Sequence, residues 1–326
     1  MSLMKSGKGL IGIDITSESI KLLELKQCRG SYQVESYAIK TLRESTLIER
    51  RIRDINDVIS TLKRALDHAQ PSTRKAAVAI PASAAITKTL SFSIELREDE
   101  IEERIMAESD RHIAFPFNDV AFDFKCLGPA PFDKGQQQVD LVACRQRDVI
   151  QLSETLELAG LEPAVVDVET FALARSLGEL RGQTPAGDAA VGADTACAGV
   201  VDIDAATHGF YVFHGQHIVY SRSAAFDDRS SLTTSLLDAV AQQAIRALQR
   251  YHTKAHQQVI QHIVLAGVSS VMPGLAERIA NDSGTPVSIA NPFQHMQINK
   301  RLNLQALMDD APTMLIAAGL AMRVNQ

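Results

Sequence analysis

Two widely separated segments of the chain carry the same order of elements. In the first segment, residues 12–25 read as two strands around a short polar turn, and Asp14 ends the first strand. An alternating strand at 32–39, an amphipathic helix over 52–66 and a short buried strand at 76–80 follow. The first segment therefore reads as strand, Asp-bearing turn, strand, strand, helix and strand.

The second segment repeats this order from residue 198 onward. A strand at 198–204 contains Asp202, and a polar break follows it. The repeat continues with strands at 210–213 and 217–220, a helix over 232–251 and a strand at 263–266. A helix from Pro273, a strand at 287–289 and a helix over 312–323 are predicted after it. This pattern indicates a duplicated α/β domain. Two such units facing one another would place two Asp-bearing hairpins on opposite sides of one phosphate chain.

A smaller unit interrupts the repeat, and a polar segment separates the two halves. Residues 86–170 predict strands at 86–92, 120–126, 139–144 and 165–168 and helices over 98–113 and around 152–159. Pro, Gly and polar residues at 182–188 mark a linker. The expected domains are 9–85, an inserted subdomain at 86–170, a helix and linker at 171–187 and a second half at 188–326.

The composition of the chain excludes several classes of protein. Its 326 residues have a net charge of −6 and contain no Trp, which argues against nucleic-acid binding. No apolar stretch reaches the roughly 20 residues that span a bilayer. The four cysteines form no C-x-x-C pair, so reduced, buried thiols are expected, with a metal site as the minor alternative.

The turn of the first hairpin has the residues that a phosphate loop needs. Backbone N–H groups and hydroxyls can hold phosphate oxygens, while a carboxylate holds hydrated Mg²⁺. The alternative is a surface hairpin whose turn is polar because turns usually are. The candidate residues are Asp14, Ser17, Ser19 and Lys21.

Several short motifs, each unspecific alone, occur together. They are GIDI at 12–15 with SIKLLEL at 19–25, AITKT at 85–89, ACR at 143–145, LAGL at 158–161, VVDVE at 165–169, ANPF at 290–293 and AGLA at 318–321. In combination they resemble the PilM family of type IV pilus assembly proteins, within the actin-like ATPase superfamily. The similarity runs from about Gly9 to Arg323.

This resemblance implies a fold and a cellular role. The fold would be an α/β actin-like ATPase fold with duplicated halves around a cleft, an FtsA-like inserted small subdomain and a reduced second helical subdomain. The protein would be a cytoplasmic adaptor at the inner face of the inner membrane, associated with the membrane only through partners. It would bind the short N-terminal peptide of PilN and link it to the pilus motor ATPases.

The resemblance also implies a nucleotide site. ATP would be held by both hairpins and a glycine after the strand at 263–266, with Mg²⁺ held through Asp14 and Asp202. Glu169 would orient an attacking water, although a Glu at a helix N-terminus is also favoured by the helix dipole alone. The implied nucleotide-binding residues are Gly12, Asp14, Ser17, Ser19, Lys21, Asp202 and Gly267.

Three departures from the family pattern argue against tight ATP binding. Asp204 stands where the family has a Gly, and a like charge at about 4–6 Å from phosphate costs on the order of a few kcal/mol. The side chain of Val268 would crowd the nucleotide. The helical segment expected between Asp228 and Leu232 is missing. An inactive adaptor is therefore expected, with an ATP-binding switch or weak ATPase as the alternative.

A partner groove is the last candidate site. Ile113, Phe115 and Phe117 surround Pro116 in a predicted loop between a helix and a strand. Apolar pockets of this kind give peptide grooves their specificity. The alternative is that these side chains belong to the core of the inserted subdomain.

Overall fold

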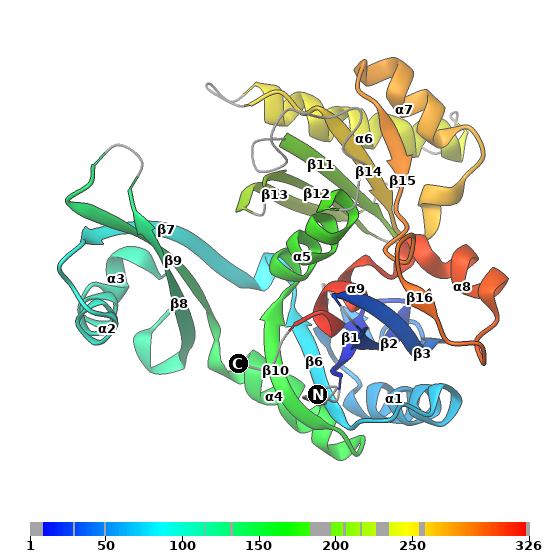
Figure 1. Cartoon of the computed structure of the whole chain (residues 1–326), viewed down its shortest axis with the longest axis horizontal. Helices are drawn as coiled ribbons and strands as arrows, with labels where there is room; N and C mark the ends of the chain where they lie inside the picture. The colour runs from blue at the N-terminus through cyan, green and yellow to red at the C-terminus, as the bar shows by residue number, and fades with distance from the viewer. Residues whose placement is uncertain are drawn as a thin grey trace, which may run out of the picture. The chain divides into compact units, whose positions relative to one another are not determined.

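Figure 1 shows the computed structural model of the chain. It describes residues 9–28, 30–48, 50–113, 115–130, 133–182, 197–204, 207–215, 217–225, 235–253 and 258–323. The chain divides into two compact units, Ile80–Thr155 and the combination of Met1–Ala79 with Leu156–Gln326. Within the described ranges, no helix is both long and apolar enough to cross a bilayer.

The larger unit contains a six-stranded sheet. Its strands, in spatial order, are β10 (Glu162–Val168), β6 (Lys75–Ile80), β1 (Ile11–Ile15), β2 (Ser19–Cys28), β3 (Ser31–Thr41) and β16 (Gln297–Ile298). Strands β1, β2 and β3 form an antiparallel meander, whereas β1 pairs with β6 in parallel. Six consecutive residues of β2 are buried, so both faces of this strand are covered.

A five-stranded sheet in the same unit repeats this topology. Its strands, in spatial order, are β13 (His217–Ala225), β12 (Thr207–His214), β11 (Cys197–Ile203), β14 (His262–Ala266) and β15 (Val287–Ile289). Strands β11, β12 and β13 again form an antiparallel meander, and β14 again joins the first strand in parallel. Each meander therefore continues through its first strand into a fourth and a fifth strand, which confirms the duplicated α/β architecture.

Helices cover both faces of the six-stranded sheet (Figure 1). Helix α1 (Ile55–Ala69) packs against β2 and β3, and helix α9 (Leu315–Ala321) packs against β1 and β2. The core on the α9 side joins Leu23 and Leu25 to Ala317 and Ala321. Because α9 lies almost 300 residues after β1 and β2, the first sheet is covered by residues that are synthesised long after its strands.

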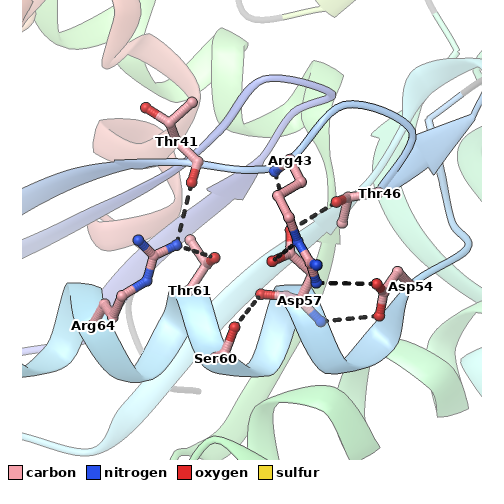
Figure 2. Close-up of polar contacts among 8 residues, drawn as sticks. All are labelled: Thr41, Arg43, Thr46, Asp54, Asp57, Ser60, Thr61 and Arg64. Atoms are coloured by element: carbon pink, nitrogen blue, oxygen red, sulfur yellow. Dashed lines mark hydrogen bonds and ion pairs between the residues drawn. The ribbon is translucent and has the colours of Figure 1, made fainter.

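The start of α1 differs from the sequence-based expectation. The spacing of isoleucines predicts a helix from Ile52, but Ile52 lies in β5 (Arg51–Ile52), which pairs with β4 (Leu47–Ile48). Asp54 caps the helix instead, because its Oδ1 accepts the backbone N–H of Asp57 at 3.1 Å (Figure 2). The Asp54 cap therefore sets the start of the helix at Ile55, whereas apolar periodicity alone places it at Ile52.

The five-stranded sheet packs against two helices, α6 (Leu236–His252) and α7 (Leu275–Ser283). Tyr251 of α6 is fully buried, and its ring meets the edges of the Phe210 and Tyr220 rings. Aromatic pairs of this geometry stabilise a core beyond the apolar area that they bury. The second half therefore has its own core.

The smaller unit is a three-stranded antiparallel sheet with helices. Strand β9 (Gln136–Arg145) lies between β7 (Ala85–Ser93) and β8 (Val120–Pro129). The predicted helix over 98–113 is two helices, α2 (Glu98–Ala107) and α3 (Ser109–His112), which meet at Glu108. The core of this unit includes Ile101 and Ile105 of α2, which pack on alternate residues of the sheet.

Three further helices complete the structure. Helix α4 (Gln146–Leu158) is followed by Gly160 at φ +88°, as expected for a left-handed glycine at a helix end. Helix α5 (Glu169–Gly182) follows β10. Helix α8 (Leu304–Asp310), which the sequence reasoning missed, starts at Asn303, whose side chain accepts the Ala306 N–H at 3.2 Å.

The compact units differ in extent from the expected domains. The sequence predicts an inserted subdomain at 86–170, whereas the smaller unit spans Ile80–Thr155 and β10 belongs to the six-stranded sheet. The expected linker at 182–188 lies outside the described residues, apart from Gly182 at the end of α5. The segment from Asp228 to Leu232 also lies outside them.

Candidate functional site

The first hairpin brings Asp14 and Lys21 together. Pairing of β1 with β2 places the two residues directly opposite one another. The Lys21 ammonium donates to Asp14 Oδ2 over 3.2 Å, and neither side chain is more than 5% exposed. Burial alone lowers the pKa of Lys21, but the charges of Asp14 and two further aspartates outweigh burial and raise it. Lys21 is therefore a permanent buried cation.

Thr16 closes the turn of this hairpin. Its hydroxyl accepts the backbone N–H groups of Glu18 at 3.4 Å and Ser19 at 3.2 Å, and it donates to the Ser19 carbonyl at 3.1 Å. Ser17 and Ser19 are half-buried in the turn. Thr16 thus uses two N–H groups that a phosphate cradle would direct at an anion. Sequence reasoning missed Thr16, although Ser and Thr hydroxyls commonly form such turns.

The second hairpin contributes Asp202 and Asp204. Asp202 pairs with Gly209 across the β11–β12 ladder, and Asp204 is buried just after the strand. Desolvation and the neighbouring Asp204 carboxylate raise the pKa of Asp202 to about 7, although Lys21 opposes the shift. Both aspartates also raise the pKa of Lys21, so charges of the second hairpin act on the ammonium group of the first.

Arg50 is a functional candidate that the sequence reasoning missed. Its guanidinium forms an ion pair with Glu169, the first residue of α5. The two side chains are 15% and 4% exposed. The carboxylate expected to orient water is therefore bonded to an arginine. No periodic pattern could have revealed Arg50, because it follows a two-residue strand.

Two ion pairs, Lys21–Asp14 and Arg50–Glu169, and the electrostatic effects of these groups on one another's pKa values link six charged side chains, which we call the charge cluster. Burial lowers the pKa of Arg50, but Glu169, Asp14 and the Tyr211 phenol outweigh burial and raise it, with a smaller effect from Asp202. The cluster holds four carboxylates and two cations. Its members are Asp14, Lys21, Arg50, Glu169, Asp202 and Asp204.

The two glycines of the predicted site have different surroundings. At Gly12, a Cβ would overlap the Ala317 carbonyl oxygen and lie 2.6 Å from the Ala321 nitrogen, so this glycine lets α9 approach β1. Gly267 has φ +85°, and a Cβ there would overlap the Ile203 carbonyl oxygen. Gly267 therefore lies against the second hairpin, whereas Gly12 is a packing position.

A pocket of about 210 Å³ joins residues from both halves. The polar groups of Ser19, Lys21 and the Asp309–Asp310 pair face apolar side chains. Val268 and Val271 belong to the 3₁₀ turn η4 (Val268–Val271) and are each about half exposed, at 51% and 53%. The lining residues include Ser19, Lys21, Ile39, Gly267, Val268 and Val271.

Two of the candidate groove residues, Ile113 and Phe115, lie in and beside the core of the smaller unit. Ile113 is buried among the core side chains, and Phe115 is partly buried against them. The Arg145 guanidinium lies 5.1 Å from the centre of the Phe115 ring, within range of a cation–π contact. Phe117 begins a 3₁₀ turn, and its side chain lies outside the described part of the chain.

Cysteine and metal chemistry can be assessed for the described residues. All four cysteines are free, and Cys144 and Cys197 are buried. Burial and the charge of Asp148 raise the pKa of Cys144 to about 11, so its thiol is protonated at neutral pH. Across the ranges that the structure describes, no group of three or more His, Cys, Asp or Glu side chains could hold a metal ion.

Comparison with known proteins identifies the class of fold. A solved structure titled "PilM-PilN type IV pilus biogenesis complex" matches with a TM-score of 0.76 and 23% identity, over 97% of this chain and 98% of that chain. The ethanolamine utilization protein EutJ from Carboxydothermus hydrogenoformans matches with a TM-score of 0.50 and 14% identity, over 96% and 89% of the chains. The fold is that of the actin-like ATPases.

The family follows from the sequence itself. The profile described as "Type IV pilus assembly protein PilM" matches residues 12–238 and 226–325. These matches cover nearly the whole chain. The chain therefore belongs to the PilM family of type IV pilus assembly proteins.

Proposed function

We propose that the chain is a cytoplasmic adaptor of the pilus assembly platform that binds the N-terminal peptide of a PilN protein. The observation that carries this proposal is the whole-length likeness to the chain in the PilM–PilN structure. The adaptor would lie at the inner face of the inner membrane and link its membrane partner to the motor ATPases. It would reach the membrane only through its partners.

The charge cluster supports an adaptor that does not hydrolyse ATP. A divalent ion bound by Asp14 would lie close to the Lys21 ammonium. Glu169 is paired with Arg50 and so cannot readily orient a water. These residues do not fit a magnesium nucleotide held between the two aspartates.

The pocket between the two halves supports the same proposal by its size. Pockets that bury a drug-sized ligand usually have volumes of roughly 300–1,000 Å³. The volume here is about 210 Å³. The carboxylates of Asp309 and Asp310 also line the pocket and would repel a triphosphate.

The smaller unit offers a surface for an extended peptide. Strands β7 and β8 are the two edges of its sheet, and an extended segment can pair with such an edge. Phe115 lies beside exposed Pro116 before β8 and is held by the Arg145 guanidinium. We infer that Phe115 contacts an apolar side chain of the peptide.

Calorimetry with a synthetic PilN N-terminal peptide tests this proposal on the full chain. We expect binding by the natural protein and a loss of at least tenfold, about 1.4 kcal/mol, for Phe115→Ala. Leu158→Ala is the matched control, because Leu158 is an apolar residue of α4 with 59% exposure. Absence of binding by the natural protein would contradict the adaptor role.

One observation favours a second candidate, an ATP-binding switch. The pocket is lined by Ser19 and Lys21 of the first predicted loop and by Gly267 next to the second. Nucleotide closure could then change partner affinity. A rise in Tm with millimolar Mg-ATP that is lost in Asp14→Ala would favour the switch, and no rise would exclude it.

A further inference from the structure

Two helices connect the two sheets of the larger unit. Helix α5 follows β10 of the six-stranded sheet, and the next described strand along the chain is β11 of the five-stranded sheet. Helix α9 comes after β15 of the five-stranded sheet and packs on β1 and β2. The turn before α9 is bonded to the second half, because the Gly267 N–H donates to the Pro312 carbonyl at 2.9 Å. Since α5 also packs against α9 (Figure 1), a rotation of one sheet against the other would shift one helix on the other.

The two helices meet closely at Gly319 of α9. A Cβ at Gly319 would overlap the Ala172 carbonyl oxygen of α5, so no side chain fits between the helices there. Two consecutive side chains of α5 donate to carbonyls one turn apart on α9. The Ser176 hydroxyl donates to the Leu315 carbonyl at 2.6 Å, and the Arg175 Nε donates to the Gly319 carbonyl at 2.8 Å. Gly319 lies in the last turn of α9, where carbonyls lack intrahelical partners, so Arg175 also caps this helix.

Asp167 joins the ends of both helices. It lies in β10 just before α5, and its side chain is 2% exposed. Its Oδ1 accepts the Val168 backbone N–H at 2.8 Å. Its Oδ2 forms ion pairs with Arg175 and with Arg323, which follows α9 and lies 2.9 Å away. Burial and the charge of Arg323 lower the pKa of Arg175, and Asp167 opposes this shift. The two guanidinium groups therefore repel one another, and the Asp167 carboxylate compensates both.

We propose that Asp167, Arg175 and Arg323 form a clasp that fixes α9 on α5 and so holds the two sheets of the larger unit in one arrangement. Loss of one partner from a buried ion pair leaves an uncompensated charge, so the clasp opposes any movement that separates its members. A fixed crossing of the helices distinguishes this chain from proteins that close by domain rotation. The proposal is independent of peptide binding, because the clasp and Phe115 belong to different compact units.

Distance measurement by pulsed electron spin resonance on the full chain tests the proposal. Spin labels are attached through Lys63→Cys on α1 and Gln249→Cys on α6, which are exposed positions in the two halves. Cys28→Ser and Cys126→Ser are included throughout, because these partly exposed thiols would also react with the label. We expect a single narrow distribution of distances when the clasp is intact.

Two substitutions open the clasp. Asp167→Asn keeps the volume of the side chain but removes the charge that both arginines share, and Arg323→Met removes one of the two cations. Each should broaden the distance distribution by about twofold or more. Arg278→Met is the matched control and should leave the distribution unchanged. Its guanidinium lies 2.9 Å from Asp238, and its side chain is 44% exposed, against 36% for Arg323.

Three results would overturn the proposal. One is a broad distribution with the clasp intact, which would mean that the crossing is not fixed. The second is a lower Tm in both clasp variants with an unchanged distribution, which would make the clasp a stabilising contact only. The third is equal broadening in Arg278→Met. If Asp167→Asn does not fold, Arg323→Met carries the test, because its guanidinium is partly exposed, and an unchanged distribution in that variant overturns the proposal.

Discussion

The β1–β2 and β11–β12 hairpins share one backbone plan but differ in charge. The residue opposite Asp14 is Lys21, whereas the residue opposite Asp202 is Gly209. Gly209 leaves room for the Tyr211 ring, since a Cβ there would lie 2.6 Å from a ring carbon. The first hairpin thus contains its own cation, and the second contains none at the matching position. The two hairpins therefore share a backbone arrangement but differ in the charges that they hold.

This difference makes the second hairpin depend on the first. Lys21 is 3.2 Å from Asp14 and also acts on Asp202 and Asp204. The pKa of Asp202 is raised to about 7 mainly by desolvation and by the Asp204 carboxylate. Lys21 therefore acts on carboxylates of both sheets, as Arg50 also does.

Removal of this shared cation should have the largest effect. We expect Lys21→Met to reduce the free energy of unfolding by about 3–5 kcal/mol, because a buried carboxylate loses its partner. Urea unfolding measures the change. Lys75→Met is the matched control, since Lys75 forms a surface ion pair with Glu162 at 3.7 Å and should lose less than about 1 kcal/mol. Equal losses in both variants would disprove the shared-cation interpretation.

A substitution on the first strand of each sheet should have a smaller effect. Gly12→Ala would force α9 away from β1, and overpacking of this kind costs about 1–3 kcal/mol. At Gly199 on β11 the nearest atom to an added Cβ is a Phe210 ring carbon at 3.4 Å. Gly199→Ala should therefore be close to neutral in the same unfolding experiment. A neutral Gly12→Ala would mean that α9 can shift without loss.

The next prediction concerns the pH dependence of stability. The folded-state pKa of Asp202 lies above its ordinary value, so the folded protein binds more protons than the unfolded chain between about pH 4 and 7. Its contribution to stability is complete below pH 4 and is lost as the pH rises toward 7. The slope is at most about 1.4 kcal/mol per pH unit. We expect Asp202→Asn to flatten this decline when unfolding is measured across the range.

Asp57 provides a control of opposite sign. Bonds from Thr46 and Arg43 lower its pKa below the ordinary value, against the effect of desolvation. Its contribution is therefore present above that value and is lost as the pH falls below about 4. Asp57→Asn should lower stability above about pH 4 and remove the decline on the acid limb, and it should leave the slope between pH 4 and 7 unchanged. A decline between pH 4 and 7 that persists in Asp202→Asn would assign it to another group.

The sequence was sufficient for the duplicated fold because its main signals are local. Alternating strands that end in Asp14 and Asp202 predict both hairpins. The apolar period over 232–251 predicts helix α6, although residues 232–234 lie outside the described residues. These features depend on which face of an element is buried, which periodicity records. The order of elements then identified the architecture.

The charge cluster could be predicted only in part, because some of its contacts are not local. Arg50 and Glu169 are 119 positions apart, and their ion pair depends on how the β4–β5 hairpin meets α5. Two-residue strands carry no periodic signal, so the sequence predicts a helix that begins at Ile52, the last residue of this hairpin. The left-handed φ of Arg50 is likewise visible only in the folded chain.

Helix α9 has a consequence for the order in which the protein folds. It covers Leu23 and Leu25 and lies against Gly12, yet it follows nearly all of the remaining chain. At 5–20 residues per second, a ribosome completes the intervening chain in roughly ten to fifty seconds. During that time the strands of the first sheet lack their final cover and are prone to aggregate. Leu23 and Leu25 therefore remain without the cover of α9 until translation has passed residue 321.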